Sequence, residues 1–325
     1  MGKLLEVEHL KKYFPSAQGT VHAVDDITFT LNEGETMGLV GESGCGKTTL
    51  GRTCIHLLES TSGTIRFEGE DVTHLNKKQL VDFRNKAQII FQDPFSSLNP
   101  RFTIRDTVME PLWLSGRYKK GPALNAECER LMDLVGLEKR FYNSYPHELD
   151  GGRRQRAGVA RAIALRPKLV VCDEPVSALD VSIQAQILNL LMDLQDEMNF
   201  TYMFITHDLS VVRHISTNIC VMYLGQMVEY APKKALFEHP YHPYSKALLS
   251  AIPTTDIHSK KERIIMKGEI TSPIDPPPGC RFAQRCPYAT EECSAGGDMP
   301  LEEVEPNHFV SCRKVREINE NLKQQ

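Results

Sequence analysis

Hydrophobic and polar residues alternate at the start of the chain and later gather into short, continuous apolar runs. Residues 4–10 and 24–31 alternate, which predicts two strands with one buried face each. The apolar runs are typical of strands buried on both faces of a parallel sheet. The pattern as a whole indicates an α/β protein. The predicted buried strands are 36–40, 87–91, 169–172 and 202–206, with a hairpin at 63–69 and helices at 47–58 and 183–197.

The sequence pattern of the chain changes twice along its length. From Asp93 to about Arg166 the pattern is mainly helical, and from about Tyr241 prolines accumulate and four cysteines appear. We expect a main domain at 1–240 with a helical subdomain at about 93–166, followed by a separate, cysteine-rich C-terminal extension at 241–325. One amphipathic face of the helical part is formed by Leu131, Leu134, Val135 and Leu137.

Composition narrows the class of protein. The formal charge is −4, with 41% hydrophobic and 25% charged residues, so the chain has no basic footprint for nucleic acid. No apolar stretch approaches the roughly 18 to 20 residues that a membrane-spanning helix needs. The first residues lack the uninterrupted apolar core of a secretory signal. We therefore expect a protein of the cytoplasm.

A glycine-rich motif follows the predicted strand 36–40. Gly41, Gly46, Lys47 and Thr48 have the G-x4-GK-T spacing of a nucleotide-binding phosphate loop, with a predicted helix directly after it. In such a loop the backbone N–H groups and the helix N-terminus surround the phosphates, the lysine reaches them and the threonine hydroxyl ligates Mg²⁺. The alternative is a chance glycine-rich turn. The expected ATP-binding residues are Gly41, Ser43, Gly44, Cys45, Gly46, Lys47, Thr48 and Thr49.

Cys45 stands apart from the other cysteines because it lies inside this loop. Nine cysteines in a cytoplasmic chain should mostly be reduced, and scattered ones are typical small buried residues. A neighbouring lysine and a helix N-terminus both favour a thiolate, so we expect Cys45 to be reactive and protected by bound ATP.

Two carboxylates end the predicted strand 169–172. Asp173 and Glu174 would stand at the carboxyl end of a buried strand, where ligands bind in open α/β sheets. There Asp173 could hold Mg²⁺, and Glu174 could orient and deprotonate the attacking water. Adjacent acids are also common on surface loops, but their pairing with a phosphate loop favours the functional interpretation.

Three further residues occupy similar positions. Gln92 closes the strand 87–91 and could contact Mg²⁺ or the water, and His207 closes the strand 202–206 and could contact the γ-phosphate. Tyr13 follows the first predicted strand, and its ring could stack on adenine. The alternatives are a satisfied loop histidine and a surface tyrosine.

With these residues in order, the chain resembles the ATPase subunits of ATP-binding cassette (ABC) transporters. The resemblance covers residues 1 to about 240 and implies a RecA-like ABC ATPase core with a helical subdomain. The segments 242–249 and 279–282 narrow it to the oligopeptide/dipeptide importer subfamily. The residues that carry it are Tyr13, the loop 41–49, Gln92, the signature region 148–156, Asp173-Glu174, Ser177 to Asp180 and His207.

The resemblance implies an ATP hydrolase that energises peptide import, bound peripherally to the cytoplasmic side of the cell membrane. Its partners would be a second ABC ATPase subunit, in this subfamily a distinct chain, two transmembrane permease subunits and an extracytoplasmic solute-binding protein. Each ATP would lie between the phosphate loop of one subunit and the signature of the other. A copy of this chain as the second subunit stays open, as do nickel, an oligosaccharide or another solute as cargo.

The signature departs from the family pattern Leu-Ser-Gly-Gly-Gln. Asp150 replaces the serine that contacts the γ-phosphate, while Gly151 and Gly152 are kept. A carboxylate about 4 Å from one phosphate charge would cost roughly 4 kcal/mol at an effective dielectric constant of 20. Arg153 could offset this charge. Either the Asp150–Arg153 pair is a compensated variant, or the site that uses this signature is weak.

Four cysteines, Cys280, Cys286, Cys293 and Cys312, lie in the C-terminal extension without a C-x2-C pair. This spacing disfavours a zinc ribbon, and spacing alone leaves free or disulfide-bonded thiols open. The resemblance implies that they ligate a [4Fe–4S] cluster.

A soluble ABC ATPase acting on ribosomes or DNA is the competing class of function. Ribosome-associated members usually carry two cassettes, whereas 325 residues hold one. Chromosome and repair members need a long coiled coil before Asp173, and the chain has no such heptad run. We therefore expect a transporter subunit that does not bind nucleic acid.

Overall fold

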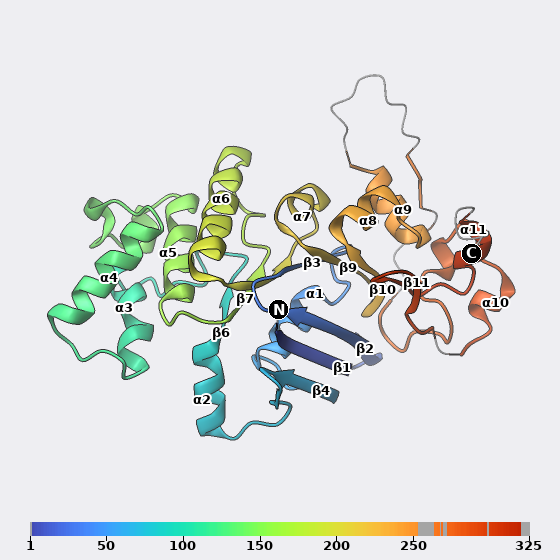
Figure 1. The fold of residues 1–325 in the computed structure, drawn as a ribbon, viewed down its shortest axis with the longest axis horizontal. Helices are drawn as coiled ribbons and strands as arrows, with labels where there is room; N and C mark the ends of the chain where they lie inside the picture. The colour runs from blue at the N-terminus through green and yellow to red at the C-terminus, as the bar shows by residue number, and fades with distance from the viewer. Residues whose placement is uncertain (1, 253–262, 267, 269–271, 298, 320–325) are drawn as a thin grey trace. The chain divides into compact units, whose positions relative to one another are not determined.

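A computed structural model of the chain describes residues 2–252, 263–266, 268, 272–297 and 299–319, and the remainder of the predicted extension lies outside these residues. The chain divides into two compact units. Unit 1 contains Asn32–Glu35, His74–Ile205 and the first few residues of the chain, and unit 2 contains Leu5–Leu31, Thr36–Thr73 and the described residues from Thr206 onward. Figure 1 shows the fold and labels most of its helices and strands.

Unit 1 is built on three parallel strands in the order β6-β7-β8. They are β6 (Ala87–Ile90), β7 (Leu169–Asp173) and β8 (Thr201–Ile205). Every residue of β7 and β8 is buried, which explains why these strands have continuous apolar sequences. The prediction of buried strands here is confirmed to within one residue at each end.

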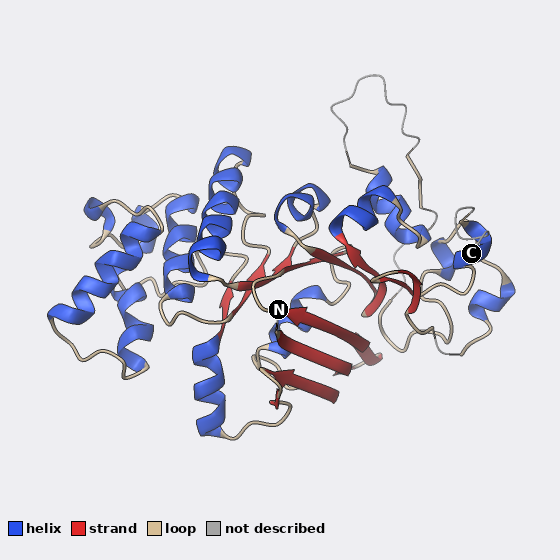
Figure 2. Cartoon of the chain, in the orientation of Figure 1, coloured by secondary structure: helices blue, strands red, loops and turns tan. Residues whose placement is uncertain are grey.

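Helices make up most of the rest of unit 1 (Figure 2). Leu131, Val135 and Leu137 are buried, as the amphipathic pattern predicts, and Leu134 is partly buried. The helical pattern predicted after Asp93 is thus confirmed. The helices are α2 (Lys77–Lys86), α3 (Ile104–Leu114), α4 (Pro122–Leu134), α5 (Gly151–Ile163) and α6 (Val181–Met198), with 3₁₀ turns at Lys139–Phe141 and Pro146–Glu148.

Unit 2 contains an antiparallel sheet with strand order β2-β1-β4-β5. The prediction that the first strand ends at Leu10 is wrong, because β1 continues to Ser16. Its register with β4 shifts between Glu8 and Lys11, and His9 there has a φ of 50°. This bulge interrupts the alternation of side chains, so the pattern stops while the strand continues. The strands are β1 (Lys3–Ser16), β2 (Gly19–Asn32), β4 (Ser62–Phe67) and β5 (Glu70–Asp71).

A second set of strands in unit 2 begins with β3 (Thr36–Val40), which pairs in parallel with β9 (Asn218–Tyr223). From β9 the pairing continues antiparallel through β10 (Gln226–Pro232) and β12 (His308–Val310) to β11 (Glu302–Glu305). Helix α1 (Lys47–Cys54) follows β3. It ends at Cys54, four residues earlier than predicted, since the sequence pattern extends to Leu58. It stops because His56 takes a left-handed φ of 55°.

The residues that follow β10 are tied to this strand by a buried carboxylate. Glu229 accepts hydrogen bonds from the backbone N–H groups of Tyr241 (2.7 Å) and His242 (3.0 Å) and lies 2.7 Å from Nε2 of His308. None of the helices in the described residues is long and apolar enough to cross a membrane. The remaining helices of unit 2 are α7 (Leu209–Ile215), α8 (Lys233–Glu238), α9 (Pro243–Ser250), α10 (Glu291–Ser294) and α11 (Val315–Ile318), with a 3₁₀ turn at Ala283–Arg285.

Candidate nucleotide-binding site

The phosphate loop lies between β3 and α1, and its glycines are required by the local geometry. A Cβ atom on Gly41 would lie 2.2 Å from the carbonyl oxygen of Met222, and one on Gly46 would lie 1.9 Å from that of Ala23. Gly46 also has a φ of 103° and is the N-cap of α1. Because the cap is a glycine, it has no side chain that could bind the N–H groups of the first turn. That turn contains Thr48 and Thr49, and its N–H groups are left for a ligand.

Lys47 reaches back over this loop. Its ammonium group donates to the carbonyl oxygens of Gly41 at 2.8 Å and Glu42 at 2.9 Å, and the side chain is almost fully buried. Ser43 and Gly44 lie at the exposed tip of the loop. The loop is therefore preformed, with a cation held at its centre.

The expectation that Cys45 is a thiolate is wrong. Burial raises the pKa of the Cys45 thiol, and this effect outweighs the opposing charge of Lys47, whose Nζ lies 3.6 Å from Sγ. The side chain is only 3% exposed, so a reagent would have little access to it.

Glu42, a residue that the sequence did not single out, is held from the far end of the chain. Its two carboxylate oxygens accept from the guanidinium of Arg285 at 2.6 and 3.0 Å, and its backbone N–H donates to the hydroxyl of Tyr244 at 2.8 Å. The signal that could have revealed this is the charge itself, because a carboxylate inside a loop built for phosphates needs a compensating cation.

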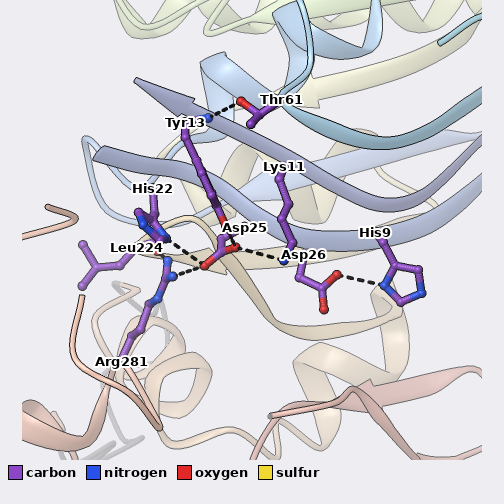
Figure 3. Close-up of polar contacts among 9 residues, drawn as sticks. All are labelled: His9, Lys11, Tyr13, His22, Asp25, Asp26, Thr61, Leu224 and Arg281. Carbon is purple, nitrogen blue, oxygen red and sulfur yellow. Dashed lines mark hydrogen bonds and ion pairs between the residues drawn. The ribbon is translucent and has the colours of Figure 1, made fainter. Parts of the chain in front are cut away.

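Tyr13 lies within β1, and its ring is fixed on several sides (Figure 3). Its backbone N–H donates to Thr61, its hydroxyl donates to Asp25, and its ring stacks on that of His22 with 4.1 Å between centroids. Burial and the hydrogen bond to Asp25 raise the pKa of Tyr13. Burial alone would raise the pKa of Asp25, but the bond from Tyr13 and the charge of Arg281 outweigh it and lower that pKa.

The two predicted carboxylates stand at the carboxyl end of β7. Asp173 is completely buried, and Glu174 follows it with a left-handed φ of 46°. Nε2 of Gln92, the second residue after β6, donates to the Glu174 carboxylate at 2.8 Å. A glutamate in this backbone conformation costs on the order of 1–3 kcal/mol, a kind of strain that is typical of functional sites.

His207 follows β8 and is exposed. The preceding residue, Thr206, donates its backbone N–H to the carbonyl oxygen of Leu39 in β3, two residues before the phosphate loop. Within unit 2 the chain therefore brings His207 to the strand that leads into this loop.

The signature residues begin helix α5. Asp150 is its N-cap and accepts the backbone N–H of Arg153 at 2.8 Å, and the guanidinium of Arg153 also pairs with the Asp150 carboxylate. Gly151 and Gly152 pack closely on the segment that follows β7. A Cβ on Gly152 would lie 2.7 Å from Cγ2 of Ile183, so a larger residue would push α5 and α6 apart.

The four C-terminal cysteines line one pocket in unit 2, together with His242, Phe282 and Lys314. Burial raises the pKa of three of these thiols, that of Cys312 to about 11. Among the described residues, no three His, Cys, Asp or Glu side chains converge as they would around a single metal ion. The four thiols are Cys280, Cys286, Cys293 and Cys312.

The predicted site residues thus fall into two groups. Unit 2 gathers Tyr13, the phosphate loop and His207, and unit 1 gathers Gln92, Asp173 and Glu174 together with the signature. A buried lysine in a glycine loop and a pair of carboxylates after a buried strand define a phosphate-loop ATPase of the α/β class.

Comparison with known proteins identifies the family. The ABC transporter family matches residues 24–177, and the C-terminal region of oligopeptide/dipeptide transporters matches residues 228–293. The chain is 50% identical over 320 residues to the oligopeptide transport ATP-binding protein AppF of Bacillus subtilis (strain 168), covering 95% of this chain and 96% of that one. It is 47% identical over 314 residues to the oligopeptide transport ATP-binding protein OppF of the same organism, covering 96% and 97%. This chain therefore belongs to the family of ABC transporter ATP-binding proteins.

Solved structures agree on the fold. The ATP-binding cassette MJ0796, solved as a dimer in a post-hydrolysis state bound to ADP and Pi, matches with a TM-score of 0.66 and 26% identity over 71% of this chain and 99% of that one. CbiO1 from Clostridium perfringens, part of the ABC transporter complex cbiONQ, matches with a TM-score of 0.64 and 26% identity over 74% and 92%. The RecA-like ABC ATPase core expected from the sequence is thus confirmed.

Proposed function

We propose that this chain binds and hydrolyses ATP and thereby energises the import of oligopeptides or dipeptides. The observation that carries the proposal is the preformed phosphate loop, in which Lys47 is already held over the carbonyl oxygens of Gly41 and Glu42. The substrate class rests on the relatives, which are named as oligopeptide transport ATP-binding proteins.

In this proposal each predicted site residue has its own role in the chemistry. The N–H groups of the loop and of the first turn of α1 receive the phosphates, and Lys47 neutralises part of their charge. Thr48, Asp173 and Gln92 supply oxygen ligands for Mg²⁺. Glu174 takes the proton of the attacking water, and His207 contacts the γ-phosphate. Tyr13 supplies a ring for the adenine, which its fixed orientation favours over the role of a surface tyrosine.

The direct test is Glu174→Gln in the full chain assembled with its partners. Hydrolysis should fall by at least about a hundredfold, the usual contribution of a positioned general base, while ATP binding is retained. The matched control is Glu129→Gln, because Glu129 lies on the surface of unit 1 and pairs with Arg105 at 3.3 Å. A Glu174→Gln protein that hydrolyses ATP as fast as the control would contradict the proposed role.

The second half of each site would come from a partner ATPase, which we propose to be a distinct chain. The signature Asp150-Gly151-Gly152 of this chain would then face the ATP held by that partner. Because Arg153 and the start of α5 both balance the charge of Asp150, we favour the compensated variant over a weak site. Two permeases, a solute-binding protein and a position on the cytoplasmic side of the membrane complete the assembly.

The residues from 241 onward form, in this proposal, a cysteine-rich extension that holds a [4Fe–4S] cluster. Four thiol side chains that line one pocket fit such a group, because its four irons need ligands spread around a cube rather than converging on a single ion. Cys280, Cys286, Cys293 and Cys312 would hold it, and the cluster would supply a structural or redox-sensing function. The hydrolysis of ATP does not require it.

A further inference from the structure

The segment from Cys280 to Cys286, here called the Cys280–Cys286 loop, carries two arginines whose side chains are nearly buried. The Arg281 side chain is 6% exposed and that of Arg285 is 8% exposed. An arginine cannot lose its charge in a protein, so a buried one needs a carboxylate or several acceptors. Both arginines find their carboxylates in the nucleotide-binding part of unit 2.

Arg285 is paired with the phosphate loop. Its guanidinium forms a two-pronged bond to the Glu42 carboxylate, and Glu42 stands between Gly41 and Ser43 of the motif. Without this cation a carboxylate beside the phosphate site would repel the triphosphate. Tyr244 holds the same residue by its backbone N–H. The conformation and the charge of the loop therefore both depend on residues after 240.

Arg281 is paired with Asp25, the carboxylate that also binds the Tyr13 hydroxyl (Figure 3). Its guanidinium donates to Asp25 and to the carbonyl oxygen of Leu224, and Asp25 in turn accepts from the Tyr13 hydroxyl. The orientation of the Tyr13 ring is thus fixed through a chain of two bonds that begins at Arg281.

Phe282 anchors the loop between the two arginines. It is 1% exposed and makes edge contacts with Tyr223 (5.2 Å between centroids) and tilted contacts with Tyr244 (5.4 Å). Because the aromatic rings fix the loop in place, a change at either arginine should act on the nucleotide site rather than be absorbed by movement of the loop.

We propose that the Cys280–Cys286 loop is a positioning element for the nucleotide, in which Arg285 sets the phosphate loop through Glu42 and Arg281 sets the base platform through Asp25 and Tyr13. The inference rests on the proposed ATP-binding function. It assigns to a segment more than 230 residues from the phosphate loop a direct effect on the affinity for ATP.

The effect of Arg285 on the phosphate loop is tested with Arg285→Gln in the full chain. The variant is titrated with ATP labelled on its ribose in the presence of Mg²⁺. The dissociation constant should rise by about tenfold, the lower end of the effect of removing a charge-assisted bond. Arg316→Gln is the matched control, because Arg316 pairs with Glu302 at 2.8 Å on the surface of the same C-terminal part. If Arg285→Gln does not fold, Tyr244→Phe is measured instead and should lose about threefold.

The effect of Arg281 on Tyr13 is tested with Arg281→Gln and with Asp25→Asn. The two ligands are ATP and inorganic triphosphate. Both variants should weaken binding of ATP by about tenfold but change the affinity for inorganic triphosphate, which has no base, by less than about twofold. Arg285→Gln should weaken both ligands. A general loss of structure would not produce this split between ligands.

A double-mutant cycle between Glu42→Gln and Arg285→Gln measures the coupling directly. Once Glu42 is neutral, Arg285→Gln should have less than about a twofold further effect. Equal affinity in Arg285→Gln and the Arg316→Gln control, or an undiminished effect of Arg285→Gln when Glu42 is neutral, would overturn the inference. If wild-type protein fails to bind ATP, or binds equally after Lys47→Ala, the proposed function itself fails.

Discussion

Two partly buried carboxylates of unit 2 are each paired with an arginine from the C-terminal part of the chain. Glu42 is paired with Arg285 and Asp25 with Arg281, so the charge of each nearly buried guanidinium is matched by a carboxylate. The thiols of the C-terminal pocket differ, because burial raises the pKa values of Cys280, Cys286 and Cys312, that of Cys312 to about 11. An iron–sulfur cluster is held by thiolates, so its binding would release protons from these thiols.

The proposed iron–sulfur cluster can be tested at one of its cysteines. Protein purified without oxygen should contain about four irons and as much acid-labile sulfide per chain, and Cys312→Ser should lose both. Cys128→Ser is the matched control, since Cys128 is a buried single cysteine of helix α4. Wild-type protein without iron or sulfide, or an iron content that Cys312→Ser leaves unchanged, would contradict the cluster.

Individual elements follow the sequence pattern where burial is uniform and depart from it where the backbone is irregular. Strands β7 and β8 were predictable because all of their residues are buried. The full length of β1 was not, because the bulge at His9 breaks the alternation, and the end of α1 was not, because His56 leaves the helical region. Helix α5 lies in the stretch predicted to be mainly helical, but the capping role of Asp150 became visible only from its bond to the backbone N–H of Arg153.

The N-terminus of helix α5 can be tested by substitution of Asp150 and Arg153. Asp150→Ser combined with Arg153→Gln keeps a capping hydroxyl and removes both charges, so it should preserve or raise ATP hydrolysis by the assembled complex. Asp150→Ala loses the cap and should lower the stability of the chain by about 1 kcal/mol, measured by thermal unfolding. A large loss of hydrolysis in the double variant, with unfolding unchanged, would mean that the Asp150–Arg153 pair takes an active part.

Across the whole molecule, the sequence revealed the parts of the site that are local in the chain. The phosphate loop and Asp173-Glu174 each lie within a few residues and follow a strand, so their spacing carries the signal. Tyr244, Arg281 and Arg285 were missed as site residues because they meet Glu42 and Asp25 only through tertiary structure. Spacing cannot reveal contacts between residues that are 200 or more positions apart.

The role of this chain in energising an importer depends on the whole assembly. The most direct measurement is purification of the full chain from its native membranes in mild detergent, followed by identification of the proteins that come with it. We expect two polytopic permeases, a second ABC ATPase and a solute-binding protein, whose retained ligand should be a peptide rather than nickel or an oligosaccharide. Recovery of the chain alone, or with ribosomes, from the soluble fraction would contradict a role in transport.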